Sequence, residues 1–214
     1  MYIFDLDGTL IDSNGLWVDV DVEFLTRRGL TITAEYEAVV ARSIFPAAAQ
    51  FTRSYYHLPD TPEEIMAEWE ELAAHHYRDL VPLKPGAEAF LRQCQREGRP
   101  LSLFTACRPR LCQLALDRFG FTPLFRHIVY AEALGLDKHD PRCFARLCQL
   151  MEVSPQQCTL FDDNPDNCAT AVASGMAAVG VYDPLYAHRK AELSACCTRF
   201  VHSLEELLCI PAHR

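Results

Sequence analysis

The sequence lacks any apolar run long enough to cross a membrane, and it lacks a basic excess. A bilayer-spanning helix needs about 20 consecutive apolar residues, and no stretch of the 214 residues approaches that length. The net charge of −9 disfavours nonspecific binding to nucleic acid or to acidic membranes, because both reward a basic surface. The N-terminus also lacks the pattern of a secretory leader. We therefore expect a cytoplasmic protein with neither nucleic acid nor membrane as a partner.

Paired cysteines at short spacing are missing as well. All ten cysteines lie from Cys94 onward, no CxxC pair occurs, and only Cys196 and Cys197 are adjacent. A zinc site usually requires such paired ligands, so the sequence does not favour one. Several cysteines, such as Cys112 and Cys143, fall at helical positions beside apolar residues. We expect these to be small buried hydrophobic side chains in their reduced form.

The chain from residue 84 onward alternates between helical and strand-like segments. We expect strands at the start of the chain and at 100–104, 127–130, 158–161, 177–181 and 200–201. We expect helices at 87–97, 110–119, 141–151 (capped by Asp140), 166–174 and 204–208. This alternation predicts an α/β fold, a Rossmann-like parallel sheet with helices on both faces.

The segment between the first strand and residue 84 reads as helices only. Thr61 and Glu64 form a capping-box pattern around Pro62, which is typical of a helix start. The length of the chain suits one core domain with an insertion. We therefore expect a core domain of residues 1–13 and 84–214, with a small all-helical domain, residues 14–83, inserted after the first strand.

Two aspartates one residue apart end the first apolar run. Asp5 and Asp7 begin on the same side of a strand, and two carboxylates so close repel each other unless a cation or a shared proton offsets their charge. Gly8 then allows a tight turn or a close approach to a ligand. A calcium loop requires glycine at its sixth position, and Gly8 would be the fourth. The arrangement therefore calls for another metal or a reaction.

Three more polar clusters lie at or beyond the ends of expected strands. Thr105 ends one strand, Lys138 precedes a helix, and Asp162 and Asp163 follow another apolar strand. A lone Thr is usually a turn or cap residue, and a lone loop Lys is usually solvated. Two acidic pairs at separate strand ends are harder to explain in this way, because a parallel sheet brings such ends together.

The order and spacing of these clusters resemble the haloacid dehalogenase superfamily, in particular its cap-bearing phosphatase and β-phosphoglucomutase-like group. The family's first motif, DxDGT, matches residues 5–9 completely. Its later motifs match Thr105, Lys138 and the pair Asp162 and Asp163. The helical insertion is similar to the family's small cap domain, where Arg42 and Arg53 are candidate substrate contacts, although a surface role suits each.

The resemblance implies a role for each motif residue. Asp5 would be the nucleophile and Asp7 the general acid and base. The ion would be Mg²⁺, with Asp5, Asp7 and Asp163 as ligands and Asp162 nearby or bound through water. Thr105 and Lys138 would hold the transferring phosphoryl oxygens.

The same motifs imply that Gly8, Thr9 and Ala106 contribute to phosphate binding. Three departures blur the assignment to a particular substrate group. Ala106 stands where relatives often carry Asn, and Asn167 stands where they often carry Gly. Lys138 is followed by His139-Asp140-Pro141, where relatives more commonly carry Pro-x-Pro-Asp. None of the three removes a charge from the motifs.

The leading hypothesis is a Mg²⁺-dependent phosphatase that hydrolyses a small phosphorylated metabolite, such as a sugar phosphate, through an aspartyl-phosphate. Dehalogenases of the superfamily lack the second carboxylate and its transport ATPases carry Thr there, so Asp7 argues against both. Two alternatives stay open: a phosphosugar mutase of the β-phosphoglucomutase type, and a catalytically inactive binding protein. The oligomeric state does not follow from the sequence.

Overall fold

A computed structural model describes residues 1–40, 43 and 45–208 of the chain. These residues form two compact units, one containing Met1–Asn14 and the chain from Val81 onward, and the other containing Gly15–Leu80. The expected boundaries lay at 13/14 and 83/84, a few residues away. The role of the second unit as a cap stays a prediction. We refer to the two as the core unit and the helical unit.

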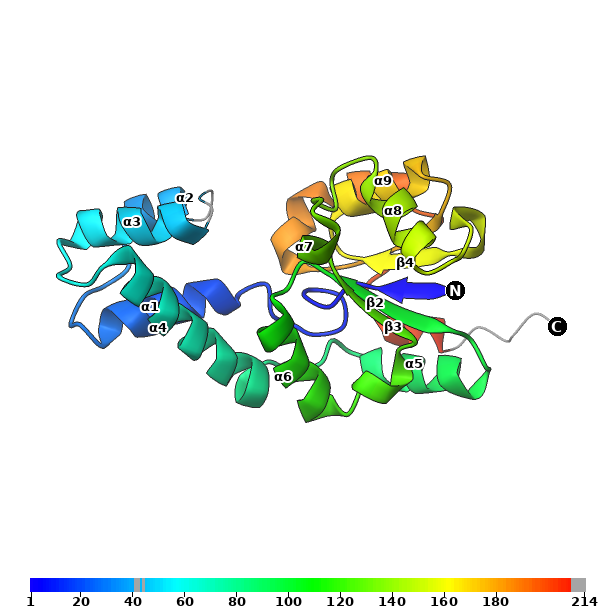
Figure 1. The fold of residues 1–214 in the computed structure, drawn as a ribbon, viewed down its shortest axis with the longest axis horizontal. Helices are drawn as coiled ribbons and strands as arrows, with labels where there is room; N and C mark the ends of the chain where they lie inside the picture. The colour runs from blue at the N-terminus through cyan, green and yellow to red at the C-terminus, as the bar shows by residue number, and fades with distance from the viewer. Residues whose placement is uncertain (41–42, 44, 209–214) are drawn as a thin grey trace. The chain divides into compact units, whose positions relative to one another are not determined.

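The core unit is built on a parallel sheet, as the alternating pattern predicted (Figure 1). Among the described residues, six strands pair in the order β3-β2-β1-β4-β5-β6, and every pairing is parallel. The strands are β1 (Tyr2–Phe4), β2 (Leu101–Thr105), β3 (His127–Tyr130), β4 (Thr159–Asp162), β5 (Ala177–Val181) and β6 (Arg199–Val201). The central strand β1 pairs Phe4 with Leu103 on one side and with Phe161 on the other. This register places the ends of β1, β2 and β4 at the same edge.

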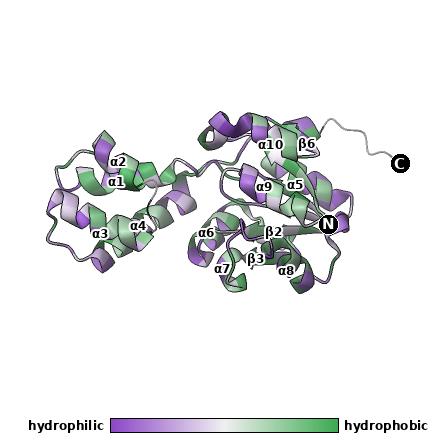
Figure 2. Cartoon of the chain, turned by 90° about the horizontal axis from the view of Figure 1, so that it is seen from above, coloured by the Kyte–Doolittle hydropathy of each residue, from purple (hydrophilic) through white to green (hydrophobic). Residues whose placement is uncertain are grey.

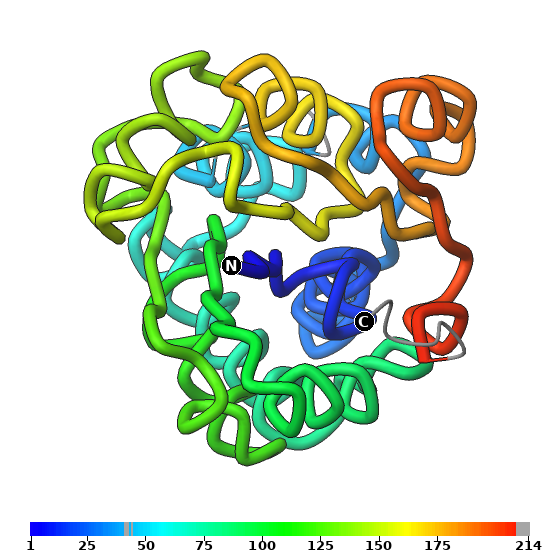
Figure 3. The backbone as a smooth tube through the Cα atoms, turned by 90° about the vertical axis from the view of Figure 1, so that its right-hand side faces the viewer, coloured from blue at the N-terminus to red at the C-terminus, as the bar shows by residue number. Residues whose placement is uncertain are grey.

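Helices cover both faces of this sheet, with α5 and α6 on one face and α8 and α9 on the other (Figures 1 and 3). The α-helices of the core unit are α5 (Ala87–Arg96), α6 (Pro109–Phe119), α7 (Ala131–Leu134), α8 (Cys143–Leu150), α9 (Pro165–Ala173) and α10 (Lys190–Cys196). Because side chains alternate along a strand, Phe4 stacks on Phe161 at 4.5 Å next to α5. Ile3 packs into the cluster with Phe144 of α8.

Several short elements differ from the sequence expectation. Leu204–Leu207 (η5) is a 3₁₀-helix and not an α-helix, and α8 begins at Cys143, two residues later than expected. Asp140 does not cap α8 in the expected position, but its Oδ1 accepts the Arg142 backbone N–H at 2.8 Å. The remaining 3₁₀ turns are η2 (Thr122–Leu124), η3 (Pro155–Gln157) and η4 (Pro184–Arg189).

The helical unit contains α1 (Leu16–Thr26), α2 (Ala34–Val40), α3 (Phe45–Tyr56), α4 (Pro62–His75) and the π-helical turn η1 (His76–Leu80). The predicted capping box starts α4: Thr61 Oγ1 accepts the Glu64 N–H at 3.2 Å, and Glu64 accepts the Thr61 N–H at 2.7 Å. Hydrophilic and hydrophobic residues mix along α3 and α4 (Figure 2), as expected for helices buried on one side. Phe24 of α1 and Trp69 of α4 pack in the unit's core.

Candidate active site

The chain turns sharply after β1, where the first acidic pair lies. The Leu6 carbonyl accepts the Ile11 N–H at 3.0 Å, and Gly8 N–H donates to the Ile11 carbonyl at 2.8 Å. Gly8 has a φ of +76°, in the left-handed region that favours glycine. A Cβ on Gly8 would lie 2.2 Å from Asn14 Nδ2 and 2.3 Å from Asp163 Oδ2. This turn therefore requires glycine for both its conformation and its lack of a side chain.

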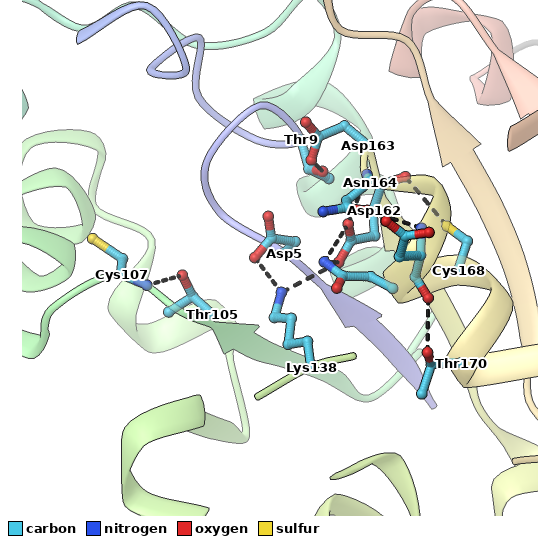
Figure 4. Close-up of polar contacts among 12 residues, drawn as sticks. Asp5, Thr9, Thr105, Cys107, Lys138, Asp162, Asp163, Asn164, Cys168 and Thr170 are labelled. Atoms are coloured by element: carbon cyan, nitrogen blue, oxygen red, sulfur yellow. Dashed lines mark hydrogen bonds and ion pairs between the residues drawn. The ribbon is translucent and has the colours of Figure 1, made fainter. Parts of the chain in front are cut away.

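Three carboxylates meet beyond this turn. Asp5, Asp162 and Asp163 are buried, and each offers one oxygen within 4.8 Å of the oxygens of the other two. The ammonium group of Lys138 lies 2.6 Å from Asp5 Oδ1 and 3.2 Å from Asp162 Oδ2 (Figure 4). Four of the residues predicted from separate parts of the sequence thus form one buried charged cluster.

Neutral donors fix the two adjacent carboxylates at the end of β4, Asp162 and Asp163. Asn167 Nδ2 donates to both oxygens of Asp162, at 3.0 and 3.1 Å. Asp163 accepts from Asn14 Nδ2 at 2.8 Å and from Thr9 Oγ1 at 3.3 Å. The turn after β1 and the start of α9 are therefore tied together through Asp163.

Burial and charge repulsion change the pKa values in this cluster. Burial raises the pKa of Asp5 to about 7, against the opposing pull of Lys138, and the nearby carboxylates of Asp162 and Asp7 raise it further. Burial and the same kind of repulsion, from Asp162 and Asp5, hold the pKa of Asp163 well above its usual range. Burial acts to lower the pKa of Lys138, but the carboxylates of Asp162 and Asp5 outweigh it and raise that pKa. The lysine is thus a permanent cation facing an excess of acid groups.

The cluster opens into a cavity of about 540 Å³ in the core unit. Asp5, Asp7, Lys138 and Asp163 line it, and so does Ala106. Asp7 is held by the Ser13 hydroxyl, which donates to Asp7 Oδ1 at 2.6 Å. Five predicted site residues therefore share one solvent-connected space.

Four of the predicted residues are not among the described residues that line this cavity: Gly8, Thr9, Thr105 and Asp162. Thr105 and Asp162 are fully buried at the ends of β2 and β4. The hydroxyl of Thr105 accepts the Cys107 N–H at 2.9 Å, so its own hydrogen can still be donated. Gly8 and Thr9 contribute to the turn, and Thr9 reaches the cluster through Asp163.

The cluster fits a hard divalent cation. Its oxygen ligands are those that Mg²⁺ prefers, and three acidic groups with one lysine leave excess negative charge. In addition, Asn167 Oδ1 is buried without a hydrogen-bond donor among the described residues. Asn167 also lines the cavity, and its Nδ2 is hydrogen-bonded to Asp162.

Sequence reasoning missed part of the cavity wall. Tyr186 and Asn164 line it, and Asn164 Nδ2 donates to the Tyr186 hydroxyl at 2.9 Å. His139 and Asn14 line it too. Asn164 and His139 adjoin motif residues, which is a usable signal, but nothing in the sequence marks Tyr186. Of the candidate cap arginines, Arg53 is exposed on α3, and Arg42 lies outside the described residues.

Comparison with known proteins identifies the family. A family model described as haloacid dehalogenase-like hydrolase matches residues 1–175. The chain belongs to the haloacid dehalogenase-like hydrolases. The predicted superfamily and the predicted enzyme class are thereby confirmed.

Individual relatives agree with this assignment. The chain is 27% identical over 184 residues to validoxylamine A 7′-phosphate phosphatase of Streptomyces hygroscopicus subsp. limoneus, covering 84% of each protein. It is 23% identical to hexitol phosphatase B of Escherichia coli (strain K12), covering 85% of this chain and 83% of that protein. A crystal structure from Thermotoga maritima, provisionally described as a β-phosphoglucomutase, matches with a TM-score of 0.84 at 22% identity over 97% of this chain and 95% of the other. At this identity the structural likeness establishes the fold.

None of the helices in the described part of the chain has the length and apolar character required to span a bilayer.

Proposed function

We propose that this protein is a Mg²⁺-dependent phosphatase that hydrolyses a small phosphate monoester through an aspartyl-phosphate on Asp5. One observation supports this most: buried Asp5 lies in hydrogen-bond contact with Lys138, beside Asp162 and Asp163, at the edge of an open cavity. Sequence relatives named as phosphatases of a validoxylamine phosphate and of hexitols support the same chemistry.

In the first step, an oxygen of the Asp5 carboxylate attacks the phosphorus of the bound ester. The bond between phosphorus and the leaving oxygen breaks, and protonated Asp7 gives its proton to that oxygen. A covalent intermediate divides one difficult displacement into two easier ones. The Ser13 hydroxyl, 2.6 Å from Asp7 Oδ1, would hold the acid in position.

In the second step, the Asp7 carboxylate accepts a proton from water while the water oxygen attacks phosphorus. The bond between phosphorus and Asp5 breaks, which releases inorganic phosphate and regenerates the enzyme. Proton transfer by a positioned side chain typically contributes about 10²–10⁴-fold to the rate.

The remaining motif residues would bind the phosphoryl group. Lys138 would neutralise its developing negative charge, and the Thr105 hydroxyl would donate to one of its oxygens, since positioning and charge stabilisation dominate phosphoryl transfer. Gly8 and Thr9 shape the turn next to Asp5, and Ala106 lines the cavity without occupying the space that a larger side chain would fill.

We assign Asp5, Asp163 and the backbone carbonyl of Asp7 as the protein ligands of Mg²⁺, with Asp162 beside them. When bound, Mg²⁺ would neutralise the acidic cluster and supply positive charge to the phosphate oxygens. We also propose that the helical unit acts as a cap that excludes water and contacts the leaving group, with a small phosphorylated metabolite as the substrate.

A metabolite screen tests the activity. The purified protein with Mg²⁺ should release free phosphate, detected with malachite green, from one or more small phosphate esters. Asp5→Asn should reduce the rate by about 10³-fold or more, because the nucleophile is lost. Asp12→Asn, which changes an exposed carboxyl in the same segment, is the matched control and should keep the activity. A fully active Asp5→Asn enzyme would overturn the assignment of Asp5 as the nucleophile. If the unaltered protein releases no phosphate from any ester tested, an inactive binding protein would be favoured.

A phosphosugar mutase is the second candidate, because the high structural similarity extends to a protein provisionally described as a β-phosphoglucomutase. Incubation with a hexose 1-phosphate separates the two. A phosphatase gives free phosphate, whereas a mutase gives the 6-phosphate without release.

A further inference from the structure

Tyr186 lies on the wall of the active-site cavity, outside the motifs that the proposed function uses. It belongs to η4, the turn that follows β5, and it lines the cavity together with Asp5 and Lys138. The described lining of this cavity comes entirely from the core unit. The phosphatase mechanism assigns no task to this tyrosine.

A buried ion pair holds the turn that carries Tyr186. Lys84 Nζ donates to Asp183 Oδ2 at 2.8 Å, and both side chains are buried. The other Asp183 carboxylate oxygen accepts the Leu185 N–H at 2.9 Å, and the Asp183 carbonyl accepts the Tyr186 N–H at 3.2 Å. The position of Tyr186 is therefore fixed by residues that take no part in the proposed catalytic steps.

Asn164 makes the Tyr186 hydroxyl a hydrogen-bond acceptor on one side. Asn164 is the N-cap of α9, and its Oδ1 accepts the Asp166 N–H at 2.8 Å. This contact identifies the amide oxygen, so the group that meets the Tyr186 oxygen at 2.9 Å is Nδ2, a donor. The hydrogen of the Tyr186 hydroxyl has no acceptor among the described residues. Burial raises the pKa of Tyr186 to about 12, so the hydroxyl keeps this hydrogen at neutral pH and has one donor left for a ligand.

The exposure of the lining side chains orders the cavity from its floor to its opening. Asp5 and Lys138 are buried. Tyr186 and Asn164 are half-buried, and His139 is exposed. His139 Nε2 lies 3.4 Å from Asn164 Nδ2, so the hydroxyl of Tyr186 belongs to the outer part of the wall.

The direction of the displacement assigns this outer wall to the alcohol part of the substrate. In phosphoryl transfer the attacking and leaving oxygens lie roughly in line across phosphorus. With Asp5 attacking from the buried side, the leaving oxygen and its alcohol point toward the opening, where Tyr186 lies. Lys138 and Thr105 serve the phosphoryl oxygens under the proposed function, so the free hydrogen of Tyr186 is left for the alcohol.

We propose that the Tyr186 hydroxyl donates a hydrogen bond to a hydroxyl oxygen of the alcohol part, so that the enzyme selects phosphate monoesters of polyols over those of simple alkyl alcohols. A substrate without that hydroxyl would leave the tyrosine donor unpaired in a half-buried place, which disfavours it. The inference rests on the proposed function, because it takes the phosphoryl group to lie beside Asp5. It adds a substrate class and the residue that recognises it.

Two esters of matched size test this contact with the full-length protein and Mg²⁺. Glycerol 1-phosphate carries hydroxyl groups on the carbons beyond the ester, and propyl phosphate has the same carbon chain without them. We expect kcat/KM to be about tenfold higher for the glycerol ester, as the loss of one hydrogen bond implies. Equal values for the two esters would overturn the proposal, and this comparison does not depend on a variant that folds.

Two matched variants assign the preference to one hydroxyl. Tyr186→Phe keeps the ring and should lower kcat/KM for the glycerol ester to about the value for the propyl ester, which should itself be unchanged. Tyr182→Phe, at a half-buried tyrosine outside the described lining of the cavity, should keep the preference. If Tyr186→Phe lowers kcat/KM equally for both esters, the hydroxyl does not act on the alcohol part and the proposal is wrong.

Phosphonates separate this inference from the proposed function. 3,4-Dihydroxybutylphosphonate and butylphosphonate carry carbon in place of the ester oxygen, so their binding can be measured without hydrolysis. Isothermal titration calorimetry with Mg²⁺ should show about tenfold tighter binding of the dihydroxy compound, and Tyr186→Phe should remove the difference.

The two failures then differ. If no ester is hydrolysed but the calorimetric difference is present and depends on Tyr186, the phosphatase proposal is wrong and the tyrosine contact is supported. If esters are hydrolysed and the two phosphonates bind equally, the tyrosine contact is wrong and the phosphatase proposal is unaffected. Absence of binding by both phosphonates would overturn the tyrosine contact too.

Discussion

The buried carboxylates of the candidate active site oppose folding. Asp5, Asp162 and Asp163 share a space that contains one lysine, and the pKa of Asp5 is raised to about 7 because burial disfavours its charged form. Isolated buried charges are costly unless they are paired or bind a metal. These carboxylates lower the stability of the fold, yet hydrogen bonds hold them in fixed positions. Such a combination is expected at a functional site.

A substitution at Gly8 would test how closely the turn after β1 packs against the cluster of buried carboxylates. We expect Gly8→Ala to reduce phosphate release at least tenfold and to lower the free energy of unfolding by more than about 1 kcal/mol. The new Cβ would collide with Asn14 and Asp163 in addition to the strain at φ +76°. Activity assays and urea denaturation measure the two effects.

The control is Gly98→Ala, at a glycine that has φ +70° and no atom within 4 Å of an added Cβ. It should show only the conformational cost of about 1 kcal/mol and full activity. If both variants lose activity equally, the close approach at Gly8 has no special importance.

The sequence predicted the charged residues of the candidate active site better than the other residues that line its cavity. Asp5, Lys138 and Asp163 were expected together because strand ends of a parallel sheet meet at one edge, and the structure gathers them. Their catalytic and ligand roles stay predictions. Tyr186 was missed because its place in the cavity depends on the path of the chain after β5, which no local pattern encodes.

Among the secondary-structure elements, α1, α2 and α3 are joined by a buried polar contact. Asp21, Tyr36 and Thr52 come from these three helices and form a buried hydrogen-bonded set. Such a set specifies one packing of the helices, since other arrangements would leave its members unpaired. Its acidic member also makes the stability of the helical unit depend on pH.

The sign of this dependence follows from the raised pKa of Asp21. The folded state holds the proton more tightly than the unfolded state, so the contribution of Asp21 is most favourable below pH 3.8 and is lost as the pH rises to about 6. The rise in pKa from 3.8 to about 6 corresponds to about 3 kcal/mol. Two titratable groups of α2 lie close by: the Tyr36 hydroxyl bonds Asp21, and Glu37 lines the same small cavity as Asp21.

We therefore expect Asp21→Asn to gain stability relative to the unaltered protein as the pH rises from 4 to 7, by up to about 3 kcal/mol. Urea denaturation followed by tryptophan fluorescence would measure it, because both tryptophans lie in the helical unit. Asp19→Asn, which removes an exposed carboxylate from the same helix, should show no such trend. A constant difference between Asp21→Asn and the unaltered protein across this range would contradict the prediction.

The strands and long helices were predicted well from sequence, and the short elements were not. Strands β3 and β5 have the expected bounds, because a continuous apolar run between turn residues indicates a buried parallel strand. The helices α7 and α10 and the π-helical turn η1 were not expected. One to two turns carry too little periodicity to identify, and tertiary packing decides their form.

For the whole molecule, the excess of acidic groups in the core unit predicts that Mg²⁺ increases thermal stability. We expect Mg²⁺ to raise the melting temperature by several degrees, since a ligand at 100 times its Kd adds about 2.7 kcal/mol to stability. Differential scanning fluorimetry would measure this, and excess EDTA should reverse it.

Asp163→Asn should abolish most of the Mg²⁺ effect, and sodium chloride at equal ionic strength should not reproduce it. The reason is that one of the buried carboxylates would no longer be available as a ligand. An unchanged melting temperature with Mg²⁺ in the original protein would contradict the assigned ligand set.

The chain leaves the core unit after Asn14 and returns at Val81. The two segments next to these points are joined by backbone hydrogen bonds. Asp12 N–H donates to the Pro82 carbonyl and Lys84 N–H to the Leu10 carbonyl, both at 2.9 Å. Hydrogen bonds within the core unit thus hold the two ends of the inserted segment next to each other. If the helical unit acts as the proposed cap, an exchange of the entire insert would change the substrate contacts and leave the sheet and the acidic cluster at its edge unchanged.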